Sequence, residues 1–403
     1  SIFANCFSVA FFFFIKNLFC RKIKLFYDII LYKYIMILKL ISIINFKNHE
    51  NTTLKFSNNI NCFLGDNGVG KTNLLDAIHY LSFCKSYYTN VESYNVRYGQ
   101  SYFILKGVFI NNTNLELEVQ SSLKDKKKHV KLNNKTYTKL SNHIGKIPLI
   151  MITPLDTNII LGGGEDRRRF IDKLLSQLDL DYLHQLIAYN KTLQQRNTLL
   201  KSYDDTQFEL LSTYNEALSK YGSIIYHKRK DCISMIIDNV RHYYNFIAGN
   251  NEYIDIQYKS QLDDMSLDAI LIDNLQKDKI LKHTTGGVHR DDFLFTIKSN
   301  NLKRTGSQGQ QKTFLIALKF AYFDLLKSGF KEDPILLLDD IFDKLDDSRV
   351  EKIIKILNQN KFGQIFITDT NYDRINAILE KVHGNCKYFI FDINGLCDEK
   401  IKN

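Results

Sequence analysis

A glycine-rich segment before residue 73 has the residue types and the spacing that bind nucleotide phosphates. It reads G-x-x-x-x-G-K-T, in which the glycines let the backbone turn tightly so that successive N–H groups face a phosphate. The lysine of this pattern reaches the β- and γ-phosphates, and the threonine hydroxyl can bind Mg²⁺. The sequence therefore predicts an ATP and Mg²⁺ site, with Lys71 as a catalytic residue and Thr72 as a metal ligand. The whole expected loop comprises Gly65, Asp66, Asn67, Gly68, Val69, Gly70, Lys71 and Thr72.

The segments on either side of the loop fit this assignment. Residues 61–64 form a short apolar run that predicts a strand, and residues 73–81 have the apolar spacing of a helix. A helix N-terminus directly after the loop favours a bound anion, because unpaired backbone N–H groups and the helix dipole point at it. A glycine turn that matches by chance would not need this order of strand, loop and helix, so we favour the nucleotide site.

A second set of chemically active residues ends the apolar run 334–338, which is followed by Asp339 and Asp340. A continuous apolar run is typical of a buried parallel strand, and ligands of open α/β sheets bind at the carboxyl ends of such strands. Asp339 suits Mg²⁺ coordination, directly or through water. Asp340 suits polarising the attacking water. We expect both to be catalytic; the alternative is a strand followed by an aspartate that caps a helix.

Ser307, Gly309 and Gln310 open a segment with helical apolar spacing. Ser307 is a good N-cap residue, which is one explanation of the pattern. The Ser-x-Gly-Gln order just before an acidic strand resembles instead the signature of ATP-binding-cassette proteins. That resemblance implies that Ser307, the Gly309 N–H and the helix N-terminus address the γ-phosphate of an ATP held by another subunit. It also implies a dimer-contact loop at residues 343–346 and a switch strand at residues 364–370.

The composition is that of an ordinary globular protein, with 403 residues of which 44% are hydrophobic and 24% are charged. The net charge of +10 and the isoelectric point of about 9.0 are compatible with a polyanionic partner. The lysine-rich run 124–129 is either a solvated turn or a contact to phosphates. Seven cysteines are scattered without a C-x-x-C pair, so zinc ribbons and disulfide frameworks are not expected and a reducing cytoplasm fits.

Residues 1–35 differ from the rest of the chain. They contain eight of the 28 phenylalanines and five Lys or Arg against one acidic residue, so residues 36–403 carry a net charge of +6. The longest uncharged apolar run, residues 2–15, is too short to span a bilayer, and no signal-peptide cleavage pattern is evident. We interpret residues 1–35 as a translated upstream leader before a start at Met36, and we expect no membrane partner.

The pattern of apolar residues predicts an α/β fold with two lobes. Antiparallel strands with Asn-rich turns are expected in the first third of the chain, helices in the middle, and alternating strands and helices towards the end. Such alternation indicates a partly parallel sheet covered by helices. We assign residues 36–160 and 285–403 to an ATP-binding-cassette-type ATPase lobe, with a mixed sheet and an antiparallel β subdomain. Residues 161–284 are expected to form a mainly helical second lobe.

The distance between the two nucleotide motifs narrows the family. Gly65 and Ser307 are 242 positions apart, which is longer than in transporter ATPases and shorter than in the coiled ATPases that organise chromosomes. An insertion of this size resembles that of the RecF family of bacterial recombination mediators. The segments that carry the resemblance are an opening strand at 39–48, a proline-acidic and a double-arginine segment at 154–156 and 165–172, a histidine-arginine-aspartate segment at 287–292, and the acidic strand with its loop at 337–349.

The chain departs from the family pattern at four positions. Leu155 stands where an acidic residue is usual and Gly164 where proline is usual, while Asp343 and Lys344 replace a small residue and an acidic one. These departures concern contacts around loops and leave the motifs intact. Thr368, with the aspartate after it, occupies the switch region where transporters carry a histidine.

The resemblance implies a slow ATPase that dimerises on ATP and binds duplex DNA at single-strand gaps. It further implies a cytoplasmic protein that works with RecR and RecO to load RecA in DNA repair, replication and the SOS response to DNA damage. The residues alone indicate an ATP-dependent dimerising ATPase with a basic surface. Two alternatives remain. One is another clamp ATPase of DNA maintenance. The other is a transporter ATPase subunit, which rests only on the phenylalanine-rich residues 1–35.

Overall fold

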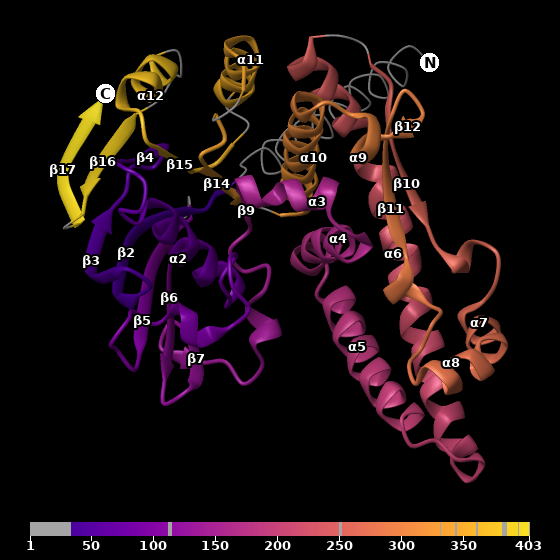
Figure 1. The fold of residues 1–403 in the computed structure, drawn as a ribbon. Coiled ribbons are helices and arrows are strands. Elements are labelled where there is room, and N and C mark those ends of the chain that lie inside the picture. The colour runs from indigo at the N-terminus through magenta and orange to yellow at the C-terminus, as the bar shows by residue number, and fades with distance from the viewer. Residues whose placement is uncertain are drawn as a thin grey trace, which may run out of the picture.

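Figure 1 shows a part of the molecule built around two sheets and, beside it, a part built mainly from long helices. Two sequence predictions fall wholly or largely outside the described residues: the leader at 1–35, of which only the last two residues are described, and positions 343 and 344 of the expected contact loop. The computed structural model describes residues 34–111, 115–249, 252–330, 332–342, 345–359, 362–380, 385–393 and 395–402.

Six strands form the sheet that carries most of the predicted chemistry. Every residue of β4, β14 and β15 is buried, and these strands run parallel to one another and to β9 and β16. Parallel strands end at one edge of a sheet, so the residues after β4 and β14 lie at the same edge. In spatial order the strands are β17 (Gly395–Lys402, antiparallel), β16 (Cys386–Asp392), β4 (Ile60–Leu64), β15 (Ile365–Asp369), β14 (Ile335–Asp339) and β9 (Leu149–Ile152).

An antiparallel sheet packs beside the first one around the helix α2 (Lys71–Phe83). Buried and half-buried residues alternate along β5, as expected for a strand with one face on the core. The apolar faces of both sheets and of α2 share a single hydrophobic core. In spatial order the antiparallel strands are β3 (His49–Lys55), β2 (Ile37–Phe46), β5 (Phe103–Ile110), β6 (Glu116–Lys124), β7 (Lys127–Leu132) and β8 (Lys135–Thr136).

Four long helices form the second part of the molecule. The longest of them, α6, packs against both α5 and α10, and α10 also contacts the edge strand β9 of the parallel sheet. The helix α10 therefore belongs to the contact between the two parts of the molecule. The long helices are α4 (Gly164–Leu178), α5 (Leu180–Leu200), α6 (Phe208–Ala248) and α10 (Gln308–Gly329).

The remaining elements are short. A small antiparallel sheet lies beside α6, and a parallel pair joins β1 to β13. The small sheet consists of β10 (Ile254–Lys259), β11 (Asp292–Ile297) and β12 (Asn300–Asn301), and the pair consists of β1 (Tyr34–Ile35) and β13 (Glu332–Asp333). The short helices are α3 (Thr157–Leu161), α7 (Leu267–Asp273), α8 (Leu275–Leu281), α9 (Leu302–Thr305), α11 (Asp347–Asn358) and α12 (Tyr372–Leu379).

The α/β prediction is confirmed, including the strand before the nucleotide loop, the acidic strand β14 and the helix α10. The elements β9, β16, β17 and α12 were not predicted from the sequence. The middle range 161–284 contains β10 in addition to helices, and β10 pairs with β11 from the range that follows. Within the described part of the chain, no helix is long and apolar enough to cross a membrane.

Candidate nucleotide site

The loop after β4 has a backbone that only glycine adopts easily. Gly65, Gly68 and Gly70 have φ angles of 143°, 89° and 108°, a region that residues with a Cβ atom rarely occupy. At Gly65 a Cβ atom would lie 2.2 Å from the backbone oxygen of Phe391. The last glycine, Gly70, leads directly into α2. The glycines of the motif are therefore required by the path of the chain as well as by the spacing of the pattern.

The Lys71 side chain folds back over this loop. Its Nζ donates hydrogen bonds to the carbonyl oxygens of Gly65 at 2.7 Å and Asp66 at 2.8 Å, and only 6% of the residue is exposed. Burial lowers the pKa of Lys71, while Asp340 and Asp339 act in the opposite direction. A positive charge is thus held against the loop, between its backbone and two acidic residues.

Three hydroxyl groups converge on the carboxylate of Asp339, which is 3% exposed. Thr72 Oγ1 and Thr368 Oγ1 donate to its Oδ1 at 2.9 and 2.7 Å, and the Tyr88 hydroxyl donates to its Oδ2 at 2.7 Å. Burial, and then the Asp339 carboxylate, raise the pKa of Tyr88, so its hydroxyl keeps the proton that it donates. Carboxylate and hydroxyl oxygens are the hard ligands that Mg²⁺ prefers, so the donor set of Thr72 and Asp339 fits that ion.

Asp340 lies beside the same threonine. Its φ of 46° turns the chain sharply after β14, and its backbone N–H donates to Thr368 Oγ1 at 3.1 Å. The Thr368 hydroxyl therefore contacts both acidic residues, accepting from one and donating to the other. The next residue of the expected switch strand, Asp369, is fully buried and accepts two hydrogen bonds of 2.8 Å from Arg374. The two switch residues thus face different partners.

Two residues that the sequence analysis gave no role hold the loop from outside. Asn48 donates from Nδ2 to the carbonyl of Val69 at 3.1 Å and accepts from Asn73 at 2.7 Å. His49 contacts the carbonyl of Gly70 through Nε2 at 3.1 Å. Burial lowers the pKa of His49, which favours a neutral ring whose Nε2–H donates to that carbonyl. The only sequence feature that pointed to Asn48 and His49 was their position at the end of the expected opening strand. No sequence feature pointed to the contact of Tyr88 with Asp339.

The residues of the expected signature lie apart from this loop. Ser307 caps α10, since its Oγ accepts from the Gln310 N–H and its own N–H donates to the Gln310 side chain. The Gln310 amide also donates to Glu252, which lies between α6 and β10, at 3.0 Å. A Cβ atom on Gly309 would lie 2.3 Å from the guanidinium of Arg349. The structure thus brings Lys71, Thr72, Asp339 and Asp340 together. It places Gln310 against Glu252 and Gly309 against Arg349 of α11 instead.

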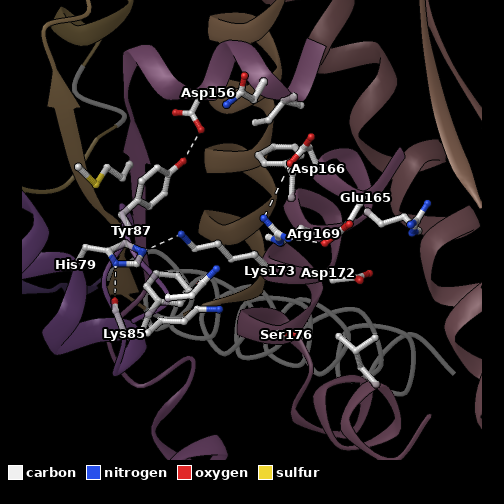
Figure 2. Close-up of a pocket in the computed structure, with 18 of the residues that line it drawn as sticks. His79, Lys85, Tyr87, Asp156, Glu165, Asp166, Arg169, Asp172, Lys173 and Ser176 are labelled. Atoms are coloured by element: carbon white, nitrogen blue, oxygen red, sulfur yellow. Dashed lines mark hydrogen bonds and ion pairs between the residues drawn. The ribbon is translucent and has the colours of Figure 1, made fainter. Parts of the chain in front are cut away.

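A cavity of about 730 Å³ lies beyond the nucleotide loop, where α2, α4 and α10 meet. Figure 2 shows Tyr87 reaching Asp156 and Lys173 reaching His79 across it. Lys319 of α10 donates to the same Asp156 at 2.8 Å. Because Tyr87 precedes Tyr88, which bonds Asp339, one short loop contacts both the acidic strand and the middle of α10.

The segments that resembled a family pattern also meet in this region. Arg167 of α4 makes two hydrogen bonds to Asp292, at 2.7 and 2.9 Å, although 125 positions separate them. Arg229 of α6 pairs with Asp172 at 2.9 Å and donates to the carbonyl of Val288 at 2.7 Å. The double-arginine and histidine-arginine-aspartate segments therefore stabilise the contact between α4, α6 and β11.

Comparisons with known proteins agree with this architecture. A family model described as RecF/RecN/SMC N terminal domain matches residues 37–384. The DNA replication and repair protein RecF of Phocaeicola vulgatus is 44% identical over 367 residues, which are 91% of this chain and 99% of that protein. A solved structure of the recombination mediator protein RecF-ATP in the RecFOR pathway is 30% identical, with a TM-score of 0.83 over 91% of this chain and 98% of that one.

A more distant likeness extends to the fold alone. The Smc head domain from Pyrococcus furiosus is 14% identical, with a TM-score of 0.54 over 91% of this chain and 96% of that one. The parallel sheet with its glycine loop, the antiparallel sheet and the helical part are thus those of an ATP-binding-cassette-type ATPase head. On its motifs, its fold and its similarity over nearly the whole length of a curated relative, the chain belongs to the RecF family.

Proposed function

We propose that this protein is an ATP-dependent, DNA-binding recombination mediator. In this proposal it binds ATP with Mg²⁺, dimerises on ATP, binds duplex DNA at single-strand gaps and assists RecA loading in repair and replication. The observation that carries it is the hydrogen bond of 2.9 Å between Thr72, at the start of α2, and Asp339, at the end of β14. It joins the two halves of a nucleotide site across 267 positions, in a chain similar to a RecF-ATP structure.

The roles of the site residues follow from their chemistry. The loop N–H groups and Lys71 would bind the phosphates, and Thr72 with Asp339 would hold Mg²⁺, which neutralises charge on the phosphates. Asp340 would accept a proton from the attacking water. Its neighbour Thr368 would hold the Asp339 carboxylate and the backbone of Asp340 together, since its hydroxyl donates to the one and accepts from the N–H of the other. Hydrolysis would be slow and would reset the DNA-bound dimer.

The signature residues are proposed to act on a second copy of the chain. Gln310 contacts Glu252 and Gly309 lies against Arg349 of α11. Neither contact is with the glycine loop, which supports a role at an ATP bound by another subunit. A helix N-terminus, a hydroxyl and a backbone N–H would then stabilise the γ-phosphate from the opposite side. A nucleotide between two copies would make dimerisation depend on ATP.

The wider assignment rests on the family. We propose RecR and RecO as partners, gapped and duplex DNA as the substrate, and the cytoplasm as the location. We also propose residues 36–160 and 285–403 as the ATPase lobe and residues 161–284 as the helical lobe. In this division β10 of the helical lobe pairs with β11 of the ATPase lobe, so the two lobes share a small sheet at that boundary.

The test separates nucleotide binding from dimerisation. Ser307→Arg places a bulky cation where the partner's γ-phosphate would lie, and Ser266→Arg is a matched control because Ser266 caps α7 in the same way. Nucleotide binding is measured by calorimetry and association by analytical ultracentrifugation with ATP. We expect both variants to bind ATP as the wild type does, and only Ser307→Arg to stay monomeric. Loss of ATP binding by monomeric Ser307→Arg would mean that Ser307 is only a cap.

A further inference from the structure

Positive charge is concentrated in one short stretch of this chain. Residues 124–146 contain eight lysines and a single acidic residue, Asp125. This stretch alone carries +7, whereas residues 36–403 together carry +6. The rest of that part of the chain is therefore close to neutral overall, and this stretch carries a local excess of positive charge that attracts polyanions.

These lysines lie on one border of the antiparallel sheet. The stretch begins at the end of β6, runs through β7 and β8, and ends before β9. In Figure 1 this border and the helices α5 and α6 extend to the same side of the parallel sheet. Six of the lysines are exposed, and we call them the lysine edge: Lys124, Lys126, Lys127, Lys135, Lys139 and Lys146.

The lysine edge continues towards the cavity between α2, α4 and α10. Lys128 of β7 donates to the carbonyl of Cys84 at 2.7 Å, which places it next to Lys85, a residue that lines the cavity. The Lys85 side chain has no hydrogen-bonding or ion-pair partner within the described ranges. Burial lowers the pKa of Lys85, and the nearby charges of Arg169 and Lys128 lower it further. Lys85, Lys128 and Arg169 thus lie close together there, and of these Lys128 also pairs with Glu92.

The lining of the cavity has more lysine and arginine side chains than carboxylates. Lys173 donates to the neutral His79 ring at 2.7 Å and lies over the rings of Phe83 and Tyr87, each at 4.3 Å, without a carboxylate partner among the described residues (Figure 2). Burial lowers the pKa of His79, which leaves Nε2 free to accept that bond. Three carboxylates of the lining are already paired with cations: Asp156 with Lys319, Asp172 with Arg229, and Glu165 with Arg169.

We propose that the lysine edge and Lys85 at the cavity form one continuous surface that binds the phosphodiester backbone of duplex DNA. This inference rests on the proposed DNA-binding function and adds the place of contact. Lysines at the ends of flexible side chains recognise phosphate charge and not base identity, so binding is independent of sequence and is weakened by salt. The stretch contains a single acidic residue, Asp125, and Lys128 is paired with Glu92, so the exposed lysines of the lysine edge carry most of the remaining charge.

The experiment uses the full chain and removes charge without reversing it. The edge variant carries Lys126→Gln and Lys127→Gln, and the cavity variant carries Lys85→Gln. The control carries Lys201→Gln and Lys277→Gln, two exposed lysines at the end of α5 and on α8, so it loses the same charge elsewhere. Duplex affinity with ATP is measured over a range of salt concentrations, together with thermal unfolding and ATP binding of each variant.

We expect the slope of log affinity against log salt to fall by about two for the edge variant and by about one for Lys85→Gln. The control should keep the wild-type slope, and all variants should melt and bind ATP as the wild type does. Failure of the wild type to bind duplex DNA with ATP would overturn the proposed function itself. A wild type that binds, alongside an edge variant with an unchanged slope or a control with an equal loss, would overturn the surface alone.

Discussion

The starts of α2 and α10 are both glycine-containing turns into a helix, yet they are completed in opposite ways. Among the described residues, no side chain caps the start of α2, and its N-cap Gly70 has a left-handed backbone. The start of α10 is closed by Ser307 and Gln310, each bonded to the other. Unpaired N–H groups at a helix start need a partner, which the start of α10 finds in its own cap and the start of α2 does not. The start of α2 is therefore suited to bind a ligand directly. The start of α10 is stable without a ligand and is suited to approach one that is bound elsewhere.

Of the changes that test this difference between the two helix starts, removal of the positive charge at the start of α2 should have the largest effect. Lys71→Ala should lower ATP hydrolysis at least about 10³-fold, because no other side chain of the loop supplies positive charge to the β- and γ-phosphates. ATP-dependent dimerisation should be lost while the melting temperature stays near that of the wild type. Lys201→Ala, at an exposed lysine, is the control. Normal turnover by Lys71→Ala would place the nucleotide elsewhere.

The next effect separates binding from hydrolysis at the same edge of the sheet. Asp340→Asn should keep ATP binding and slow hydrolysis about 10²-fold or more, because an amide cannot accept the proton of the attacking water. The ATP-bound dimer should then accumulate, which analytical ultracentrifugation detects after ATP addition. If hydrolysis and dimer lifetime both stay at wild-type values, another group is the base.

A third change tests whether the loop's backbone is as constrained as its φ angles indicate. Gly65→Ala should lower the free energy of unfolding by at least about 2 kcal/mol, because it combines backbone strain with a clash against Phe391. At Gly68 the φ is also positive, but no atom lies within 4 Å of an added Cβ, so Gly68→Ala should cost only about 1 kcal/mol. Urea unfolding measures both. If the two variants lose the same free energy of unfolding, backbone strain and not the contact with Phe391 determines the cost of the substitution at Gly65.

The smallest effect belongs to the capped helix. Ser307→Ala should lower the free energy of unfolding by about 1 kcal/mol, because it removes the acceptor of the Gln310 N–H at the start of α10. If Ser307 also addresses a partner's phosphate, the same variant should weaken ATP-dependent dimerisation, whereas Ser266→Ala at α7 should cost similar stability and leave association intact. If both variants dimerise equally well with ATP, Ser307 serves only as a helix cap.

The sequence was sufficient to predict those elements whose structure is determined by a short local pattern. The glycine loop, the apolar strand β14 and the capped start of α10 each have a short, distinctive pattern, and the structure contains all three. The parallel edge also brought Thr72 and Asp339 together, as the rule for parallel strands requires. At these positions the local sequence preferences and the long-range packing favour the same structure, so the prediction and the structure agree.

The remaining features depend on contacts between distant residues and had no local pattern. Tyr88 reaches Asp339 across 251 positions, and its neighbours in sequence give no sign of that role. The edge strand β9 is a run of only four apolar residues, which is too short to separate a strand from a helix by periodicity. The strands β16 and β17 have weak alternation and owe their place to pairing with β4 and with each other.

The position of β4 in its sheet has a consequence for synthesis of the protein. Both of its neighbours, β15 and β16, come from residues 365–392, while β4 itself is made at residues 60–64. A nascent chain on the ribosome therefore carries the glycine loop for some 300 residues before the strands that flank it emerge. Contacts this distant in sequence form late in folding. A prematurely terminated chain that lacks these strands would leave β4 without either of its neighbours, so the glycine loop after β4 would lose the sheet that supports it.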